Sequence, residues 1–94
     1  MDAMNTAQRI ERTLRERFEP LHFELVDESQ LHAGHAGAAP GGGHYRVLIV
    51  SSVFQGRGLL EQHRLVNDEL AGMIGKEIHA LSIKTLTPEQ WTSK

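Results

Sequence analysis

The sequence contains no cysteine, and this absence removes several kinds of chemistry at once. Disulfide bonds and a cysteine nucleophile are excluded, because both need the thiol. A metal site built from this chain's own thiolates is excluded for the same reason. An iron–sulfur cluster held only by cysteines of this chain is excluded as well. Any metal chemistry must therefore rely on other side chains or on ligands from a partner.

Long apolar runs and a strong basic balance are also missing. No apolar run approaches the roughly 20 residues that a membrane span needs. The N-terminus lacks the apolar core of a secretory signal, and its acidic residues argue against a transit peptide, so we expect a cytoplasmic protein. The net charge is −2 with neutral histidines, which gives no global basic field. Tight nonspecific binding to nucleic acid is therefore not implied by charge.

One stretch stands out in composition, from Ser29 to His44, with the sequence SQLHAGHAGAAPGGGH. It holds five of the nine glycines and three of the six histidines, and it contains no charged side chain. Glycine and proline at this density exclude a regular helix or strand. Loops of this length are uncommon in small domains and are usually functional or disordered. Imidazole is the side chain here that binds metals or titrates near neutral pH.

The remaining sequence predicts a small scaffold around this loop. Its 94 residues correspond to one domain, spanning residues 1–94. Apolar residues spaced three and four apart predict helices, and alternating or continuous apolar runs predict strands. The predicted order is a helix at 3–18, strands at 21–28 and 45–51, a turn region at 51–58, a helix at 59–74, a strand at 78–86 and a short helix from 87.

These elements predict an α+β fold, in which a three-stranded sheet carries helices on one face. The two strands that flank the loop should pair antiparallel, with the second one more central. Gly75 is expected to stop the second long helix. Trp91, in the short last helix, is expected to pack back on the body. The apolar stripe of the second long helix is predicted to comprise Leu59, His63, Val66, Leu70 and Met73.

Several blocks of sequence together resemble one family. They are PLHFELVDES, HAGHAG, HYRVLIVSSVFQG, HRLVND and IHALSIKTLTPEQW, and they extend from about Arg17 to Trp91. In these blocks the chain resembles the BolA family. The resemblance implies a fold like that of a class II KH domain, with a mixed sheet, an αββααβ order and a short C-terminal helix.

The resemblance implies two roles. One is an adaptor in iron–sulfur cluster assembly or trafficking, which binds a monothiol glutaredoxin with its glutathione and shares a [2Fe–2S] cluster with it. The other is a DNA-binding transcriptional regulator linked to stress, cell shape and biofilm. For the cluster, the resemblance implies His32 and His79 as ligands, with His35 as an alternative to His32. The chain lacks the cysteine that some members carry in this loop.

The residues themselves leave the metal site open. Histidine can replace cysteine on one iron of a [2Fe–2S] cluster, so a chain without thiols could supply two imidazoles to a partner's thiolates. The competing interpretation is that the loop histidines are simply solvated and that His79 is a partly buried strand residue. His44 is expected only to border the site. His63 is expected to be a core residue with a hydrogen-bonded ring.

The evidence for nucleic-acid binding and catalysis is weaker. Gly56-Arg57-Gly58 does not have the GxxG spacing with which KH domains clamp phosphates. A local basic patch is predicted from Arg57, Arg64, Lys76 and Lys84. Acidic residues on the same helix oppose it, and a solvated face of mixed charge is the alternative. No P-loop or dinucleotide motif is present, so we do not expect an enzyme. A protein-interaction module, or a homodimer, remains an alternative assignment.

Overall fold

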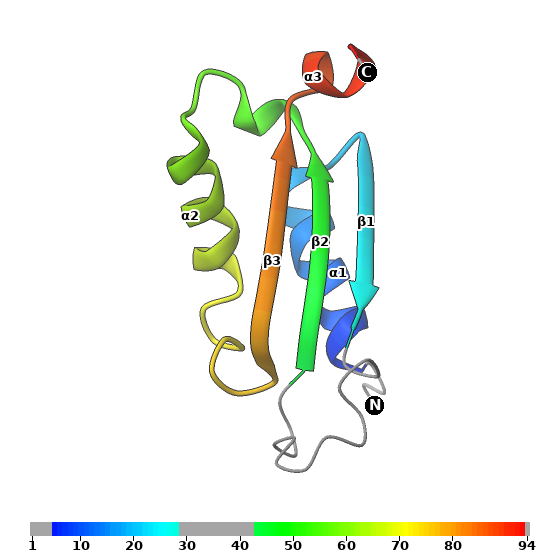
Figure 1. Cartoon of the computed structure of the whole chain (residues 1–94), viewed down its shortest axis with the longest axis vertical. Coiled ribbons are helices and arrows are strands. Elements are labelled where there is room, and N and C mark those ends of the chain that lie inside the picture. The colour runs from blue at the N-terminus through cyan, green and yellow to red at the C-terminus, as the bar shows by residue number, and fades with distance from the viewer. Residues whose placement is uncertain (1–4, 29–42, 94) are drawn as a thin grey trace.

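The computed structural model describes residues 5–28 and 43–93. Its elements lie in the order helix, strand, strand, short 3₁₀ helix, helix, strand, helix (Figure 1). They are α1 (Thr6–Phe18), β1 (His22–Asp27), β2 (Gly43–Val50), η2 (Ser52–Phe54), α2 (Leu59–Glu69), β3 (Ile78–Leu86) and α3 (Pro88–Thr92). With η2 counted as a helix, this is the αββααβ order followed by a short C-terminal helix. Within the described residues, no helix is both long and apolar enough to cross a membrane.

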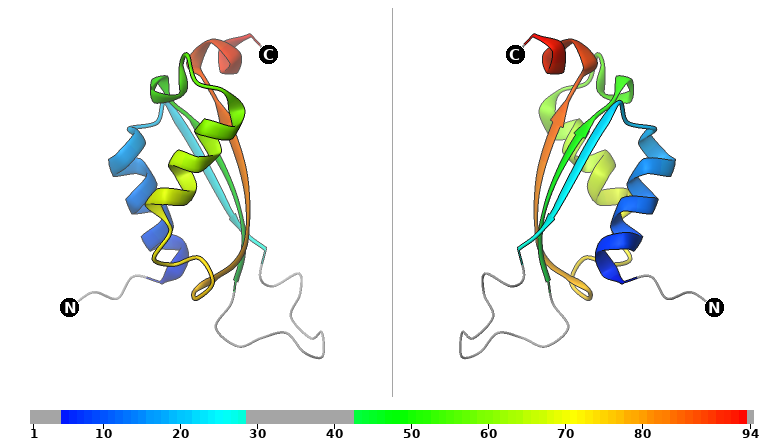
Figure 2. Two further views of the ribbon diagram at one scale, coloured as in Figure 1. Left: turned by 90° about the vertical axis from the view of Figure 1, so that its left-hand side faces the viewer. Right: turned by 90° about the vertical axis from the view of Figure 1, so that its right-hand side faces the viewer.

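The three strands form one mixed sheet in the order β1-β2-β3. β1 pairs antiparallel with β2, and β2 pairs parallel with β3, so β2 is central as the sequence predicted. α1 and α2 lie side by side on one face of the sheet, and the two edge-on views show that they leave the other face uncovered (Figure 2). We call these the covered face and the open face. α3 lies beyond the end of β3 at which the chain leaves the sheet (Figure 1).

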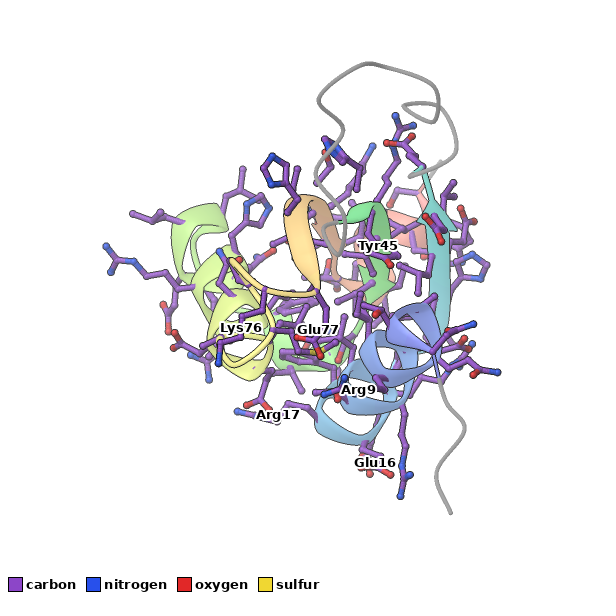
Figure 3. All side chains as sticks on the ribbon, turned by 90° about the horizontal axis from the view of Figure 1, so that it is seen from below. Arg9, Glu16, Arg17, Tyr45, Lys76 and Glu77 are labelled. Atoms are coloured by element: carbon purple, nitrogen blue, oxygen red, sulfur yellow. The ribbon has the colours of Figure 1, made fainter. Side chains whose placement is uncertain are left out.

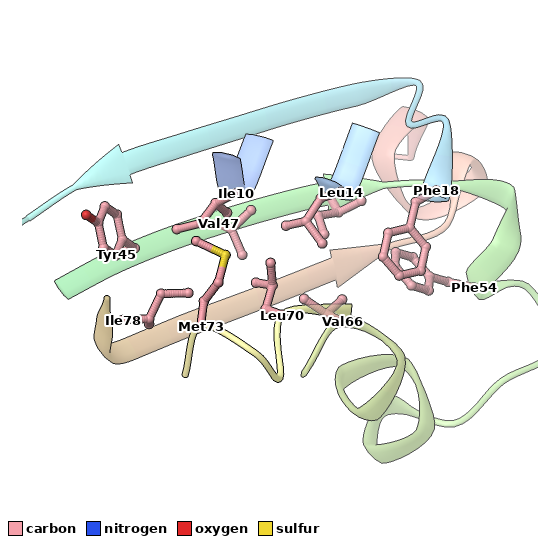
Figure 4. Packing of buried hydrophobic residues seen from close by; sticks show 11 residues of the cluster. Ile10, Leu14, Phe18, Tyr45, Val47, Phe54, Val66, Leu70, Met73 and Ile78 are labelled. Atoms are coloured by element: carbon pink, nitrogen blue, oxygen red, sulfur yellow. The ribbon is translucent and has the colours of Figure 1, made fainter. Parts of the chain in front are cut away.

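The hydrophobic core fills the space between the sheet and the two helices (Figure 4). α1 contributes Ile10, Leu14 and Phe18, which follow each other at four-residue spacing. β2 contributes alternate residues, as a strand with one covered face should. The buried apolar residues of this cluster are Ile10, Leu14, Phe18, Tyr45, Val47, Ile49, Phe54, Val66, Leu70, Met73 and Ile78.

The ends of the first and last helices are set by capping residues. The Asn5 side chain accepts a hydrogen bond from the Gln8 amide, so α1 begins at Thr6 rather than at the predicted residue 3. Thr87 caps α3 in the same way, with proline at the first position. Trp91 of α3 stacks on His22 of β1, with ring centroids 4.4 Å apart, which confirms that Trp91 packs back on the body.

The predicted stripe and length of α2 were both partly wrong. Leu59 is 63% exposed, whereas Gln62 is only 7% exposed and points inward. Its amide donates to the carbonyls of Phe54 and Arg57 and accepts from the Thr85 hydroxyl, so burial leaves no polar atom unpaired.

α2 also ends at Glu69, not at the predicted Ile74. The chain then continues in turns to β3. Gly75 lies in the last of these turns with φ +87°, a conformation that favours glycine.

Candidate metal-binding site

The candidate site lies where residues 28 and 43 mark the two ends of the histidine-rich segment. The backbone of the site is formed by the first residues of β2, which pair with the first residues of β3. The Gly43 amide donates to the Glu77 carbonyl at 3.0 Å, and the Glu28 amide donates to the His44 carbonyl at 2.7 Å. These bonds hold His44 between β1 and β3. Gly43 and His44, predicted to be part of the loop, therefore belong to β2.

An irregularity in the pairing of β2 with β3 decides where His79 lies. Gly43 is paired with Ile78, but His44 is paired with Ala80, so two residues of β3 stand opposite one residue of β2. Such a β-bulge shifts the alternation of side chains. In a regular strand, His79 would point to the same face as Leu81 and Ile83, which pack against the core. The bulge instead leaves His79 exposed, away from that core.

The imidazoles of His44 and His79 consequently lie close together. Their ring centroids are 5.2 Å apart and the ring planes are inclined by 39°. His79 is exposed and His44 is half-buried, so both sit at the surface on firmly bonded strands. The sequence did not predict this pairing, because it depends on the bulge. The only signal was the position of each histidine next to the start of a predicted strand.

Two ion pairs border the site. Arg46 contacts the Glu28 carboxylate at 2.8 Å. Arg9 of α1 contacts Glu77, the residue before β3, as the view from below shows (Figure 3). The hydrogen bond from the Arg9 guanidinium holds the pKa of the Glu77 carboxyl below its usual range. Both carboxylates are thus engaged by arginine, and no group of three or more metal-ligating side chains occurs within the described residues.

The predicted loop ligands His32 and His35 lie outside the described residues, so their positions stay predictions. Of the predicted metal ligands, the structure therefore locates His79. His63, predicted to be a core residue, is half-buried on α2. Its buried Nε2 atom has no hydrogen-bond partner among the described residues, so the expected hydrogen bond at that atom is not found.

The four predicted basic residues do not gather at one place. Arg57 lies between η2 and α2, and Lys76 lies between α2 and β3, at the opposite end of α2 (Figures 1 and 3). Arg57 also donates to Glu61 and to the Val53 carbonyl. Arg64 on α2 and Lys84 on β3 are exposed. Positive charge is therefore spread along the molecule and partly neutralised.

Comparison with known proteins gives a consistent result along the chain. The sequence profile described as BolA-like protein matches residues 14–90. The chain is 38% identical over 88 residues to the DNA-binding transcriptional regulator BolA of Escherichia coli (strain K12). The aligned region covers 94% of this chain and 81% of that protein.

Solved structures agree with this match. BolA1 from Arabidopsis thaliana superposes with a TM-score of 0.82 at 37% identity, covering 95% of this chain and 98% of that chain. The BolA domain of SufE1 from the same plant gives 0.79 at 36% identity, covering 94% and 99%. A relative from Arabidopsis thaliana, Protein BOLA2, is 42% identical over 89 residues, which cover 94% of this chain and 85% of that protein. This chain belongs to the family of BolA-like proteins.

Proposed function

We propose that this protein is an adaptor in iron–sulfur cluster assembly or trafficking. It binds a monothiol glutaredoxin with its glutathione, and the two proteins share a [2Fe–2S] cluster. His79 supplies one imidazole to the cluster, and His32 or His35 of the segment between β1 and β2 supplies the other. The partner and glutathione supply the thiolates that this chain lacks.

The observation that supports this proposal most is the setting of His79. Its ring is exposed on a hydrogen-bonded strand, at the end of the sheet where the histidine-rich segment leaves Glu28 and returns to Gly43. A ligand for a shared metal centre must be reachable by a partner, and it is more effective when its backbone is held in place. His79 meets both conditions.

The donor chemistry also fits. A [2Fe–2S] cluster needs four ligands, and two imidazoles on one iron give a higher reduction potential than four thiolates. The bound cluster would supply electron-transfer or cluster-donor chemistry, which this chain lacks by itself. The protein's own part is to hold imidazole nitrogens at the surface, where a partner protein can reach them.

The test is a titration of the purified protein with a cluster-bearing monothiol glutaredoxin, followed by visible absorption, circular dichroism and size measurement. We expect a heterodimer with a spectrum distinct from that of the glutaredoxin alone. His79→Ala and the double change His32→Ala/His35→Ala should each abolish that distinct spectrum, and His22→Ala at the far end of β1 should preserve it. An unchanged spectrum in the first two variants would reject the ligand assignment.

The shared cluster should also be labile in acid. Imidazole binds a metal only through an unprotonated nitrogen, so protons compete with iron for it. We expect the heterodimer spectrum to fade as the pH is lowered, because protonation removes the nitrogen lone pair that binds the metal. The cluster-bearing glutaredoxin alone serves as the control over the same range.

A second candidate function is binding of DNA as a transcriptional regulator, and it is favoured by the name of the Escherichia coli relative. The exposed Arg64 and Lys84 are the basic residues with which the α2 and β3 region would contact phosphates. The Arg57–Glu61 ion pair weakens this candidate, and so does the position of Lys76, which lies in the turn between α2 and β3.

DNA binding makes its own prediction about salt. Each phosphate neutralised by a basic side chain releases counterions, so affinity should fall steeply as salt rises. Changing both Arg64 and Lys84 to glutamine should flatten the dependence of log affinity on log salt. Equal affinity for all DNA sequences at moderate salt would reject a role as a specific regulator.

A further inference from the structure

His44 and His79 form a pair that neither the family match nor the proposed cluster requires. Both backbones are fixed independently of any ligand. His44 accepts from the Glu28 amide through its carbonyl, and Ile78, which precedes His79, is fully buried with its amide bonded to the Met73 carbonyl. The bulge then places two residues of β3, one of them His79, opposite His44. The two rings are therefore brought together by the sheet itself.

The spacing of the rings suits one metal ion. Zinc binds an imidazole nitrogen at about 2.0–2.1 Å, so the ion lies about 3 Å from the centroid of each ring that it binds. Two such rings that meet the ion at a tetrahedral angle have centroids about 5 Å apart. The observed separation is 5.2 Å. The observed separation therefore matches the spacing of two rings that bind the same ion.

The surroundings make this an open site rather than a closed one. The nearby Glu28 carboxylate is held by Arg46, and the Glu77 carboxylate is held by Arg9. Within the described residues, no third histidine or carboxylate joins the pair. Structural zinc sites use four protein ligands, whereas sites with fewer leave positions for water or for a group from another molecule.

We infer that His44 and His79 together bind one divalent transition-metal ion, of which zinc is the probe, in the absence of any partner protein. Imidazole is a good ligand for zinc, copper and nickel, and a poor one for magnesium or calcium. The inference does not depend on the proposed shared cluster. It does share His79 with it, so an ion held by the pair and the cluster exclude each other.

The experiment is a titration of the full chain with zinc alone, by calorimetry and by NMR of the histidine rings. The wild type should bind one equivalent and shift the ring signals of both His44 and His79. Even outer-shell residues change metal affinity by about 10- to 100-fold, so His44→Ala or His79→Ala should each weaken binding at least tenfold. Circular dichroism establishes that each variant is folded.

Two controls keep this inference separate from other metal binding. His22→Ala removes an imidazole at the other end of the sheet and should bind zinc as the wild type does. The double change His32→Ala/His35→Ala should also retain the site. Wild-type affinity in His44→Ala, or loss of binding in the double variant equal to that in His79→Ala, would overturn the inference.

The same variants distinguish this inference from the proposed function. His44→Ala should lose the zinc site but keep the shared-cluster spectrum with a glutaredoxin. The double loop variant should do the reverse. Failure of the cluster titration therefore leaves the zinc result standing, and failure of the zinc titration leaves the cluster assignment standing.

Discussion

The two faces of the sheet use polar side chains in different ways. On the covered face, Gln62 is buried and each end of its amide group has a partner, which links η2, α2 and β3. On the open face, polar rings lie at the surface, and only one end is closed by a helix. His22 packs against Trp91 of α3 at that end, whereas His44 and His79 face each other at the other end. The difference indicates that the polar group on the covered face contributes to stability, whereas the imidazoles at the loop end of the open face lie at the surface.

The largest effect is expected on the covered face. Gln62→Ala should lower the free energy of unfolding by about 2–3 kcal/mol, because it removes the acceptor of the buried Thr85 hydroxyl and the side-chain donor to the Arg57 carbonyl. Urea unfolding followed by circular dichroism measures this. The control is Glu61→Ala, which removes an exposed ion pair and should change stability by no more than about 0.5 kcal/mol. Equal losses in both variants would contradict the proposed division between the faces.

A change at Trp91, at the end of the open face where α3 lies, should have an intermediate effect on the free energy of unfolding. Val50 pairs with His22 across the strands and is fully buried, although it alternates with the core residues of β2. α3 is the element at this end, so we attribute the burial to it. Trp91→Ala should reduce stability by about 1–2 kcal/mol, less than for a fully buried tryptophan because Trp91 is half-buried. Trp91→Phe, which keeps an aromatic ring against His22, should recover part of the loss.

Much of this arrangement could be predicted from the sequence, because it depends on local patterns. The predicted bounds of β3 agree with the structure, and the antiparallel pairing of β1 with β2 is confirmed. Threonine and proline at the start of α3 are a local signal, and that helix begins where they predicted. The mixed sheet and the one-sided helices follow from the same periodicities and from the family resemblance.

The rest depends on contacts between residues that are distant in the sequence. Gln62 looks like a surface residue until Phe54 and Thr85 are known to surround it, so periodicity favoured Leu59 and His63 for the inner stripe. His44 and His79 meet only because of a bulge, which alternation alone does not reveal. Composition did point to the end of the sheet at which His44 and His79 lie close together, since the histidine-rich segment begins after Glu28 and ends at His44. The roles of His32 and His35 stay predictions.

The histidines at the loop end of the open face, His44 and His79, should contribute little to stability. His44→Ala and His79→Ala should each change the free energy of unfolding by no more than about 0.5 kcal/mol, as is usual for surface positions. His22→Ala should cost about 1 kcal/mol, because it removes the stack on Trp91 and a 2.7 Å contact with Glu24. Urea unfolding of the three variants tests this order. A larger loss in His44→Ala than in His22→Ala would show that the ring pair is structural.

The smallest effect on stability is expected from the ion pair between Arg9 of α1 and Glu77 in the turn before β3. The Arg9 hydrogen bond lowers the pKa of Glu77, so Arg9→Gln should return that pKa toward its ordinary value, which carboxyl NMR titration measures. Because the folded-state pKa is the lower one, the pair stabilises the fold above the ordinary carboxyl pKa. That contribution disappears as the pH falls through the lowered pKa. The stability difference between wild type and Arg9→Gln should therefore be present at neutral pH and vanish in acid.

Arg12→Gln, which removes the pair with Glu16, should leave the Glu77 titration unchanged. An unaltered Glu77 pKa in Arg9→Gln would show that the Arg9 hydrogen bond is not the cause of the lowered pKa.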